Sequence, residues 1–169
     1  MHRTRTLRHA IRVVGDLTKV PLGVLPEEGV TASIDHVFHA ADVETFAALS
    51  GDSNPLHVDA AFAATTTFGK PVVHGILCTS LFPTIFGATF PGAIYVAQDV
   101  RYHKPIHVGD LVHAEIEVLQ VKARMRLVVC ATRCLDRHGD VAISGQAKVL
   151  LPKPTLSADT GTPTTTSAV

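Results

Sequence analysis

The densest group of residues that could do chemistry is the run Ser50–Asp59, which holds an aspartate and a histidine five positions apart. Asp52 and His57 lie on either side of Asn54-Pro55, and the fixed φ of proline favours a turn that can bring them together. A carboxylate beside an imidazole can hold a water molecule and remove a proton from it. The same residue types also form ordinary turns. Taken alone, the pair favours the turn over catalysis.

A second group, His74-Gly75, comes directly before an apolar segment that suits a buried helix. The first amides of a helix lack partners within it, and a glycine there lets a ligand approach the backbone closely. These features suit an oxyanion hole for the enolate of a thioester carbonyl. His74 could equally be a packed or capping residue, and Gly75 a tight entry into the helix. Together with Asp52 and His57, they indicate proton transfer next to a carbonyl group.

Short helices are expected to position these groups. Asp42 is expected to cap a first helix that ends at Gly51, and Asp59 to cap a second one directly after it. The segment 75–86 is apolar on most sides, which predicts a buried helix. Pro83 lies inside it and is expected to bend or break the helix there, because proline removes a backbone hydrogen bond.

The second half of the chain has the composition and alternation of β-strands, with a turn over 136–140. In 111–122, for example, valine, alanine and isoleucine alternate with histidine and glutamate. Such alternation indicates a sheet with one buried face, and the apolar helix is the obvious partner for that face. The sequence therefore predicts an α+β fold, an antiparallel sheet around a central helix. The expected strands are 93–103, 111–122, 124–135 and 141–151.

Two stretches, Phe46–Asp59 and Phe68–Leu77, closely resemble the hydratase signature of the MaoC-like, (R)-specific enoyl-CoA hydratases. Later segments around Tyr95, Lys104 and Ser144 also look like that family's strands, so the resemblance covers roughly residues 30–152 in order. The resemblance implies a hot-dog fold, in which a sheet wraps around one long helix. It also implies a homodimer with the two sheets joined.

The resemblance also implies roles for individual residues. The family's catalytic aspartate and histidine fall on Asp52 and His57, which would hold the catalytic water and manage its protons. The amide donor of the oxyanion hole falls on Gly75, and Asn54 falls on a position that orients the loop of the pair. Pro83 stands where some bacterial members carry a serine, which puts the helix geometry and the acyl pocket in question.

Substrate contacts are expected around the same loop and helix. We place Asn54, His74 and Leu77 among the substrate-binding residues, although most apolar helix residues suit plain core. Four basic residues could meet the phosphates of CoA or an acidic acyl carrier protein, or could be solvated strand ends. They are Arg101, Lys104, Arg124 and Arg126.

The implied reaction is reversible, (R)-specific addition of water to trans-2-enoyl thioesters of CoA or of an acyl carrier protein. A hot-dog thioesterase is an alternative, but thioesterases of this fold lack the Asp-x-Asn-Pro-x-His pattern. A non-catalytic acyl-binding module is a second alternative, and the intact set of Asp52, His57 and Gly75 speaks against it.

The charge distribution suggests a separate N-terminal segment. The 169 residues carry 15 basic and 15 acidic groups, so no basic surplus points to nucleic acid. Five basic groups and one acid among residues 1–19 give +4, which leaves −4 for the rest. Arg-rich, acid-poor N-termini with helical spacing of Leu7, Ala10, Ile11 and Val14 are typical of mitochondrial transit peptides. We expect residues 1–29 to be a basic leader for mitochondrial fatty acid synthesis, with a cytoplasmic location as the alternative.

The remaining composition points to a single domain without a cofactor. Residues 153–169 are rich in threonine and proline, which predicts a disordered tail. The three cysteines lack the spacing of a zinc site, and we expect buried free thiols in a reducing compartment. We expect no metal and no cofactor. No apolar run approaches the length of about 20 residues that a membrane span needs.

Overall fold

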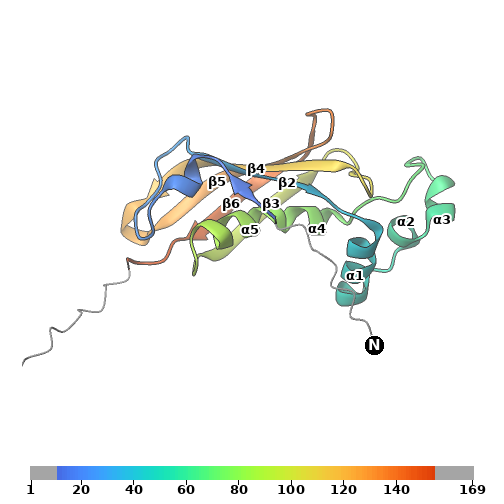
Figure 1. Cartoon of the computed structure of the whole chain (residues 1–169), viewed down its shortest axis with the longest axis horizontal. Coiled ribbons are helices and arrows are strands. Elements are labelled where there is room, and N and C mark those ends of the chain that lie inside the picture. Colours follow the sequence, from blue (N-terminus) through green and yellow to red (C-terminus); the bar gives the residue numbers. More distant parts are fainter. Residues whose placement is uncertain (1–10, 155–169) are drawn as a thin grey trace, which may run out of the picture.

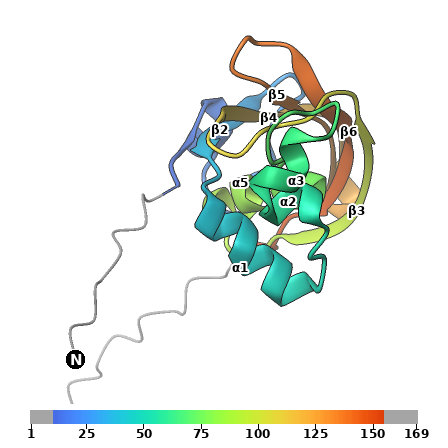
Figure 2. The ribbon, with the colours of Figure 1, turned by 90° about the vertical axis from the view of Figure 1, so that its right-hand side faces the viewer.

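The computed structural model describes residues 11–154 and contains a six-stranded antiparallel sheet wrapped around a helix, the hot-dog arrangement (Figures 1 and 2). The sheet order is β1-β2-β4-β5-β6-β3. The four expected strands are confirmed, with ends that differ by a few residues at most. The strands are β1 (Val13–Val14), β2 (Thr31–Val37), β3 (Ile94–Tyr102), β4 (Leu111–Lys122), β5 (Leu127–Leu135) and β6 (Val141–Leu150).

The N-terminal part of the described chain belongs to the sheet, which the sequence did not indicate. Val13 and Val14 pair with Ile34 and Ser33 of β2, so the expected amphipathic helix through Val14 is wrong at that end. Valine is stiff at χ1 and suits a strand. Leu17, in a 3-10 turn after β1, is fully buried in the core. Residues 13–17 therefore pack with the body of the fold, while residues 1–10 of the expected leader lie outside the described residues.

The inner face of the sheet follows the alternation most clearly in β4. Val112, Ala114, Ile116 and Val118 of β4 are buried, as their spacing indicates. In β5 the residues buried most completely are Val128, Cys130, Thr132 and Cys134. Met125, inside the expected strand 124–135, instead lies in a 3-10 turn before β5 and is exposed.

The central helix is divided in two, α4 (Gly75–Thr79) and α5 (Leu81–Thr89), separated by Ser80. The break expected from Pro83 is confirmed, but it lies three residues earlier. Proline has no N–H to give to the carbonyl of Thr79, four residues before it. As the third residue of α5, Pro83 sits in a first turn, where N–H groups have no partner within the helix.

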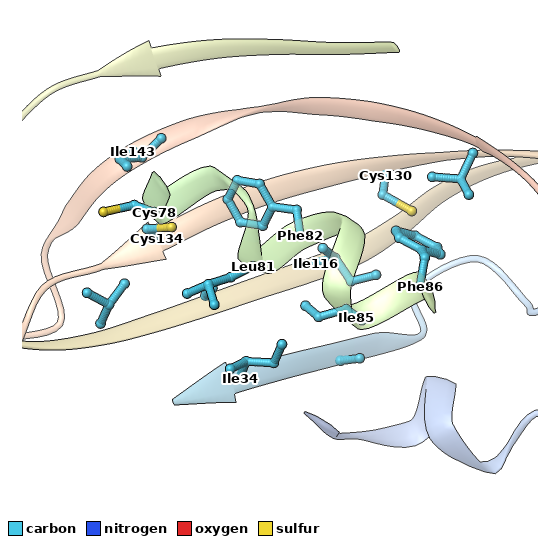
Figure 3. Close-up of a cluster of buried hydrophobic side chains, with 14 of the residues drawn as sticks. Ile34, Cys78, Leu81, Phe82, Ile85, Phe86, Ile116, Cys130, Cys134 and Ile143 are labelled. Carbon is cyan, nitrogen blue, oxygen red and sulfur yellow. The ribbon is translucent and has the colours of Figure 1, made fainter. Parts of the chain in front are cut away.

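The core lies between α4–α5 and the sheet, and α5 contributes Phe82, Ile85 and Phe86 to it (Figure 3). All three cysteines are free and buried, as expected. Burial raises the pKa of the Cys78 and Cys130 thiols to about 12, and raises the pKa of Cys134 further. These thiols are therefore packing residues.

Three helices, α1 (Ala40–Ser50), α2 (Pro55–Val58) and α3 (Ala60–Ala64), form an arm at one end of the sheet (Figure 1). The helix α1 begins before Asp42, which corrects its expected role as N-cap. The carboxylate of Asp42 instead accepts from the N–H of His39, the true N-cap, at 2.9 Å. Gly51 ends α1 in the left-handed conformation and Asp59 caps α3, both as expected.

Arg126 joins the two ends of the described chain. Its guanidinium donates to the carbonyls of Gly23 and Pro152, at 3.0 and 2.9 Å. Pro154 lies directly against Gly23. Residues 155–169, most of the expected disordered tail, lie outside the described residues. Within residues 11–154, no helix has both the length and the apolar character required to cross a bilayer.

Candidate active site

The structure brings Asp52 and His57 together, as expected from the turn at Asn54-Pro55 and from the family resemblance. Asp52 follows Gly51 at the end of α1, and His57 lies in α2. The ligand atoms of Asp52, His57 and His74 lie within 4.8 Å of one another. The Asp52 side chain is 54% exposed, while His57 is half-buried.

Asn54 shapes the loop between the two residues. Its side-chain oxygen accepts from the Leu56 N–H at 3.0 Å and so caps α2, and Pro55 supplies the first residue of that helix. The one-turn helix fixes the direction in which His57 leaves the backbone. Asn54 does not line the pocket described below; its observed contacts are those of a helix cap.

The ring of His57 is held in one orientation by the main chain of Val72. Nδ1 of His57 lies 2.6 Å from the carbonyl oxygen of Val72. A carbonyl can only accept, so Nδ1 carries the proton and the neutral ring has a bare Nε2. This nitrogen is an acceptor suited to a water molecule beside the carboxylate of Asp52.

His74, which immediately precedes α4, is 2% exposed and lies against both residues. Its Nε2 is 2.9 Å from the carbonyl oxygen of Asp52 and 3.9 Å from one oxygen of the Asp52 carboxylate. Its ring stacks on that of His57, with centroids 3.8 Å apart and planes at 29°. The ring of Phe46 in α1 packs edge-to-face with the His74 ring, at a centroid distance of 4.9 Å.

Gly75 is the first residue of α4, so its N–H has no acceptor within that helix. A Cβ at this position would overlap the ring of Tyr102, at the end of β3. Only glycine therefore fits between the aromatic ring and the helix backbone. Partial burial raises the pKa of the Tyr102 hydroxyl.

These residues line a pocket with a volume of about 520 Å³ between the arm and the end of the sheet. Four of the expected site residues, Asp52, His57, His74 and Gly75, contribute to its wall. Leu77 does not; its half-buried side chain packs on the hydrophobic core. The wall is completed by Phe68, Val72, Val73, Ile76, Cys78, Tyr102, His103, Lys104, Pro105, Ile106 and Ile143.

Tyr102, His103, Pro105 and Ile106 are pocket residues that sequence reasoning did not assign. Of the four basic residues considered for phosphate contacts, only Lys104 lines the pocket, where it pairs with Asp140. The guanidinium of Arg126 instead donates hydrogen bonds to the carbonyls of Gly23 and Pro152. The signal for Tyr102 was its position near the end of a strand, but its contact with Gly75 depends on the tertiary fold.

Asp52, His57 and His74 offer three ligand types that metals accept, so we tested the fit to an ion. An ion must lie about 2.0–2.1 Å from each imidazole nitrogen, along a lone pair in the plane of the ring. The two rings are stacked at 3.8 Å and nearly parallel, so one ion would lie outside at least one ring plane. The arrangement fits hydrogen-bonded imidazoles better than metal ligands.

Comparisons with known proteins agree on one family. The family model described as "MaoC like domain" matches residues 22–136. The chain is 44% identical over 128 residues to an (R)-specific enoyl-CoA hydratase from Aeromonas caviae, covering 75% of this chain and 96% of that protein. It is 35% identical over 119 residues to a mitochondrial 3-hydroxyacyl-[acyl-carrier-protein] dehydratase from Arabidopsis thaliana, covering 69% and 72%.

The fold is also similar to a solved structure. An (R)-hydratase from A. caviae superimposes with a TM-score of 0.73 at 43% identity, over 75% of this chain and 98% of that one. The match includes nearly the whole of that structure and about three quarters of this chain.

Proposed function

Because the chain belongs to the MaoC-like family and is a hydro-lyase, we propose that it catalyses the reversible, (R)-specific hydration of trans-2-enoyl thioesters to (3R)-3-hydroxyacyl thioesters. The observation that carries this proposal is the meeting of an exposed carboxylate and a bare imidazole nitrogen at one pocket wall. The names of the two relatives above describe the two directions of this reaction.

In the proposed hydration, one water bridges the Asp52 carboxylate and Nε2 of His57. Asp52 accepts a proton as the water oxygen bonds to the β-carbon, and the double bond's electrons move to the thioester carbonyl. The N–H of Gly75 donates to the resulting enolate oxygen, which stabilises the negative charge. A proton then returns through the pair to the α-carbon. The elements of water are added, and both residues end in their starting protonation states.

The carrier of the acyl group is CoA or an acyl carrier protein. Lys104 supports either choice, because it is a cation on the pocket wall and could exchange Asp140 for a phosphate of the carrier. We also propose a homodimer. Its support is β3, an edge strand of the sheet on which Ile94, Val96 and Tyr102 are exposed.

We propose a mitochondrial location, with a role in fatty acid synthesis, and keep the cytoplasm as the alternative. The support is the basic composition of residues 1–12 and the mitochondrial name of the A. thaliana relative. A removable leader would have to end before Val13, because Val13 and Val14 pair with β2 and Leu17 is buried. Reading the N-terminus of the mature protein by mass spectrometry tests this boundary.

The test of the reaction is a spectrophotometric assay that follows loss of the enoyl absorbance of crotonyl thioesters of CoA and of a carrier protein. Chiral analysis of the product is expected to give the (3R) isomer. Asp52→Ala and His57→Ala are each expected to lower kcat by about 10²–10⁴-fold while the protein stays folded. Glu44→Gln and His138→Ala change an exposed carboxylate and an exposed imidazole outside the pocket, and should retain wild-type turnover.

The same assay separates the alternatives. A thioester hydrolase would release free thiol, whereas a hydratase removes the double bond and keeps the thioester. A binding module would bind the thioester without either change. Near wild-type turnover in both alanine variants would exclude the assignment of Asp52 and His57.

A further inference from the structure

His74 is the buried imidazole of the pocket wall, whereas His57 is half-buried and His103 is exposed, and the proposed hydration gives His74 no step. A buried imidazole must find partners for its polar atoms or carry a cost for each one left unpaired. His74 meets this condition with one nitrogen only. Its Nε2 contacts the Asp52 carbonyl, while its Nδ1 is buried without a partner among the described residues.

The contact with Asp52 fixes a loop that is otherwise held by local bonds. The N–H of Asp52 donates to the Ser50 hydroxyl at 3.2 Å, and the N–H of Asn54 approaches the Asp52 carboxylate at 3.4 Å. Both bonds join residues two apart in the sequence. The bond from His74 comes from 22 positions away, so it ties the loop to the start of α4.

The tautomers of the two stacked histidines follow from their carbonyl partners. His74 donates from Nε2 to Asp52, so its neutral ring leaves Nδ1 bare. His57 donates from Nδ1 to Val72, so its neutral ring leaves Nε2 bare. The two rings, 3.8 Å apart, are therefore expected to be opposite tautomers. Exchanging the tautomer of either ring would break its bond to a carbonyl.

The segment Val72–Gly75 thus contacts Asp52 and His57 and also supplies the proposed oxyanion donor. The carbonyl of Val72 holds His57, the ring of His74 stacks on His57, and its Nε2 holds Asp52. The next residue is Gly75, whose N–H is the proposed oxyanion donor. These contacts tie the positions of all three groups to one segment of the chain.

We propose that His74 is a positioning residue: its Nε2–H holds the main chain of Asp52, and its ring face holds His57, so that both converge on one water. This inference rests on the proposed hydration. It differs from the substrate-binding role expected from the sequence, because the ring is 2% exposed and its Nε2 is already bonded.

Two substitutions separate the two contacts. His74→Phe keeps an aromatic ring that can stack on His57 but removes the donor to Asp52. His74→Gln can place an amide N–H near the position of Nε2 and so keep the donor, without the ring. Displacement of a catalytic group by about 1 Å can cost about 100-fold in rate. We therefore expect His74→Phe to lower kcat by about 10- to 100-fold with KM changed less than about threefold. We expect His74→Gln to recover at least about fivefold of that loss.

The kinetic outcomes decide between positioning and direct binding. A His74→Phe variant with wild-type kcat, or one in which KM rises while kcat is unchanged, would overturn the proposal. Near-ultraviolet circular dichroism and thermal midpoints of the two variants show whether each is folded. If His74→Phe does not fold, a His74→Gln variant that loses as much kcat as Asp52→Ala would still contradict the expected rescue.

A second measurement does not depend on turnover. In the wild-type protein with ¹⁵N-labelled histidine, long-range ¹H–¹⁵N spectra should show His74 as the Nε2–H tautomer and His57 as the Nδ1–H tautomer. The same tautomer in both rings would overturn the arrangement. If the wild-type protein hydrates neither the CoA nor the carrier-protein thioester, the proposed function fails. The spectra would still test the positioning of Asp52 and His57.

Discussion

The arm α1–α3 and the body formed by the sheet with α4–α5 are built in different ways. In the arm, the groups that fix the backbone are exposed polar caps, such as Asn54 and Asp59. In the body, fully buried apolar residues such as Phe82 and Ile85 hold the helix and the sheet together. Hydrogen bonds specify direction, whereas apolar burial supplies most of the free energy of folding. The difference indicates that geometry for catalysis and stability of the fold are largely separate properties here.

The largest effect on this comparison is expected from Phe82→Ala in α5. Phe82 is fully buried, so truncation should lower the free energy of unfolding by about 3–5 kcal/mol. The kcat of the molecules that remain folded should stay within about threefold of wild type, because Phe82 does not line the pocket. Urea unfolding and turnover at low temperature measure the two quantities.

Leu49→Ala, in the arm, is the matched control, since Leu49 is 84% exposed. Its expected cost is within about 0.5 kcal/mol. A cost equal to that of Phe82→Ala would mean that the arm is covered in the assembled protein, and the comparison would then fail.

A smaller effect per residue is expected from pH. Burial raises the pKa of Cys78 and Cys130 to about 12, while an unfolded thiol ionises near 9.0. Above this value the unfolded state releases protons that the folded state keeps, so the free energy of unfolding falls as pH rises. The expected slope is about 1.4 kcal/mol per pH unit for each such thiol, between about pH 9 and 12.

Urea midpoints at pH 8 and pH 10 measure this slope. A variant with all three cysteines changed to alanine removes the thiol contribution and should show a flatter pH dependence. Since the chain has no cysteine between residues 40 and 64, this effect belongs to the body alone. If the free energy of unfolding had the same pH slope in the wild type and in the triple alanine variant, burial would not be raising the pKa of the thiols.

Apart from the Leu49→Ala control, the smallest effect is expected in the arm, from Asp59→Ala. The Asp59 carboxylate accepts from the N–H groups of Ala61 and Phe62 at 2.8 and 3.0 Å, and its loss should cost about 0.5–2 kcal/mol. Because α3 contacts α2, which carries His57, kcat should fall by less than about tenfold. Asp59→Asn can retain the cap and should restore both quantities. A loss of kcat as large as that of Asp52→Ala would contradict a role limited to capping.

The strong local signals in the sequence predicted much of the body and part of the arm. Strand composition identified β3, and alternation identified β4–β6. The Gly51 and Asp59 caps were correct because capping depends on a few neighbouring atoms. Strand β2 was missed because only Ala32 and Ile34 face the core in a segment that also contains Asp35 and His36. Short, half-polar strands acquire their stability from pairing, which a local pattern does not show.

The proximity of Asp52 and His57 was predictable from the sequence, and the contacts around the two residues were less so. The pattern around Asp52 and His57 placed these two groups together, and the structure agrees. The stack of His57 on His74 and the packing of Tyr102 on Gly75 join segments far apart in the sequence. Such contacts follow from the tertiary fold, so neither spacing nor composition could reveal them. The altered role proposed for His74 arises from this part of the structure.

The sheet order also bears on how the protein folds. The hairpins β4–β5 and β5–β6 join neighbouring strands, whereas Val37 of β2 pairs with Leu111 of β4 across the whole segment that carries Asp52, His57 and Gly75. Closing so long a loop before its contacts form is slow. A chain emerging from the ribosome must complete β4 before β2 can pair with it, so we expect the site to be assembled late in folding.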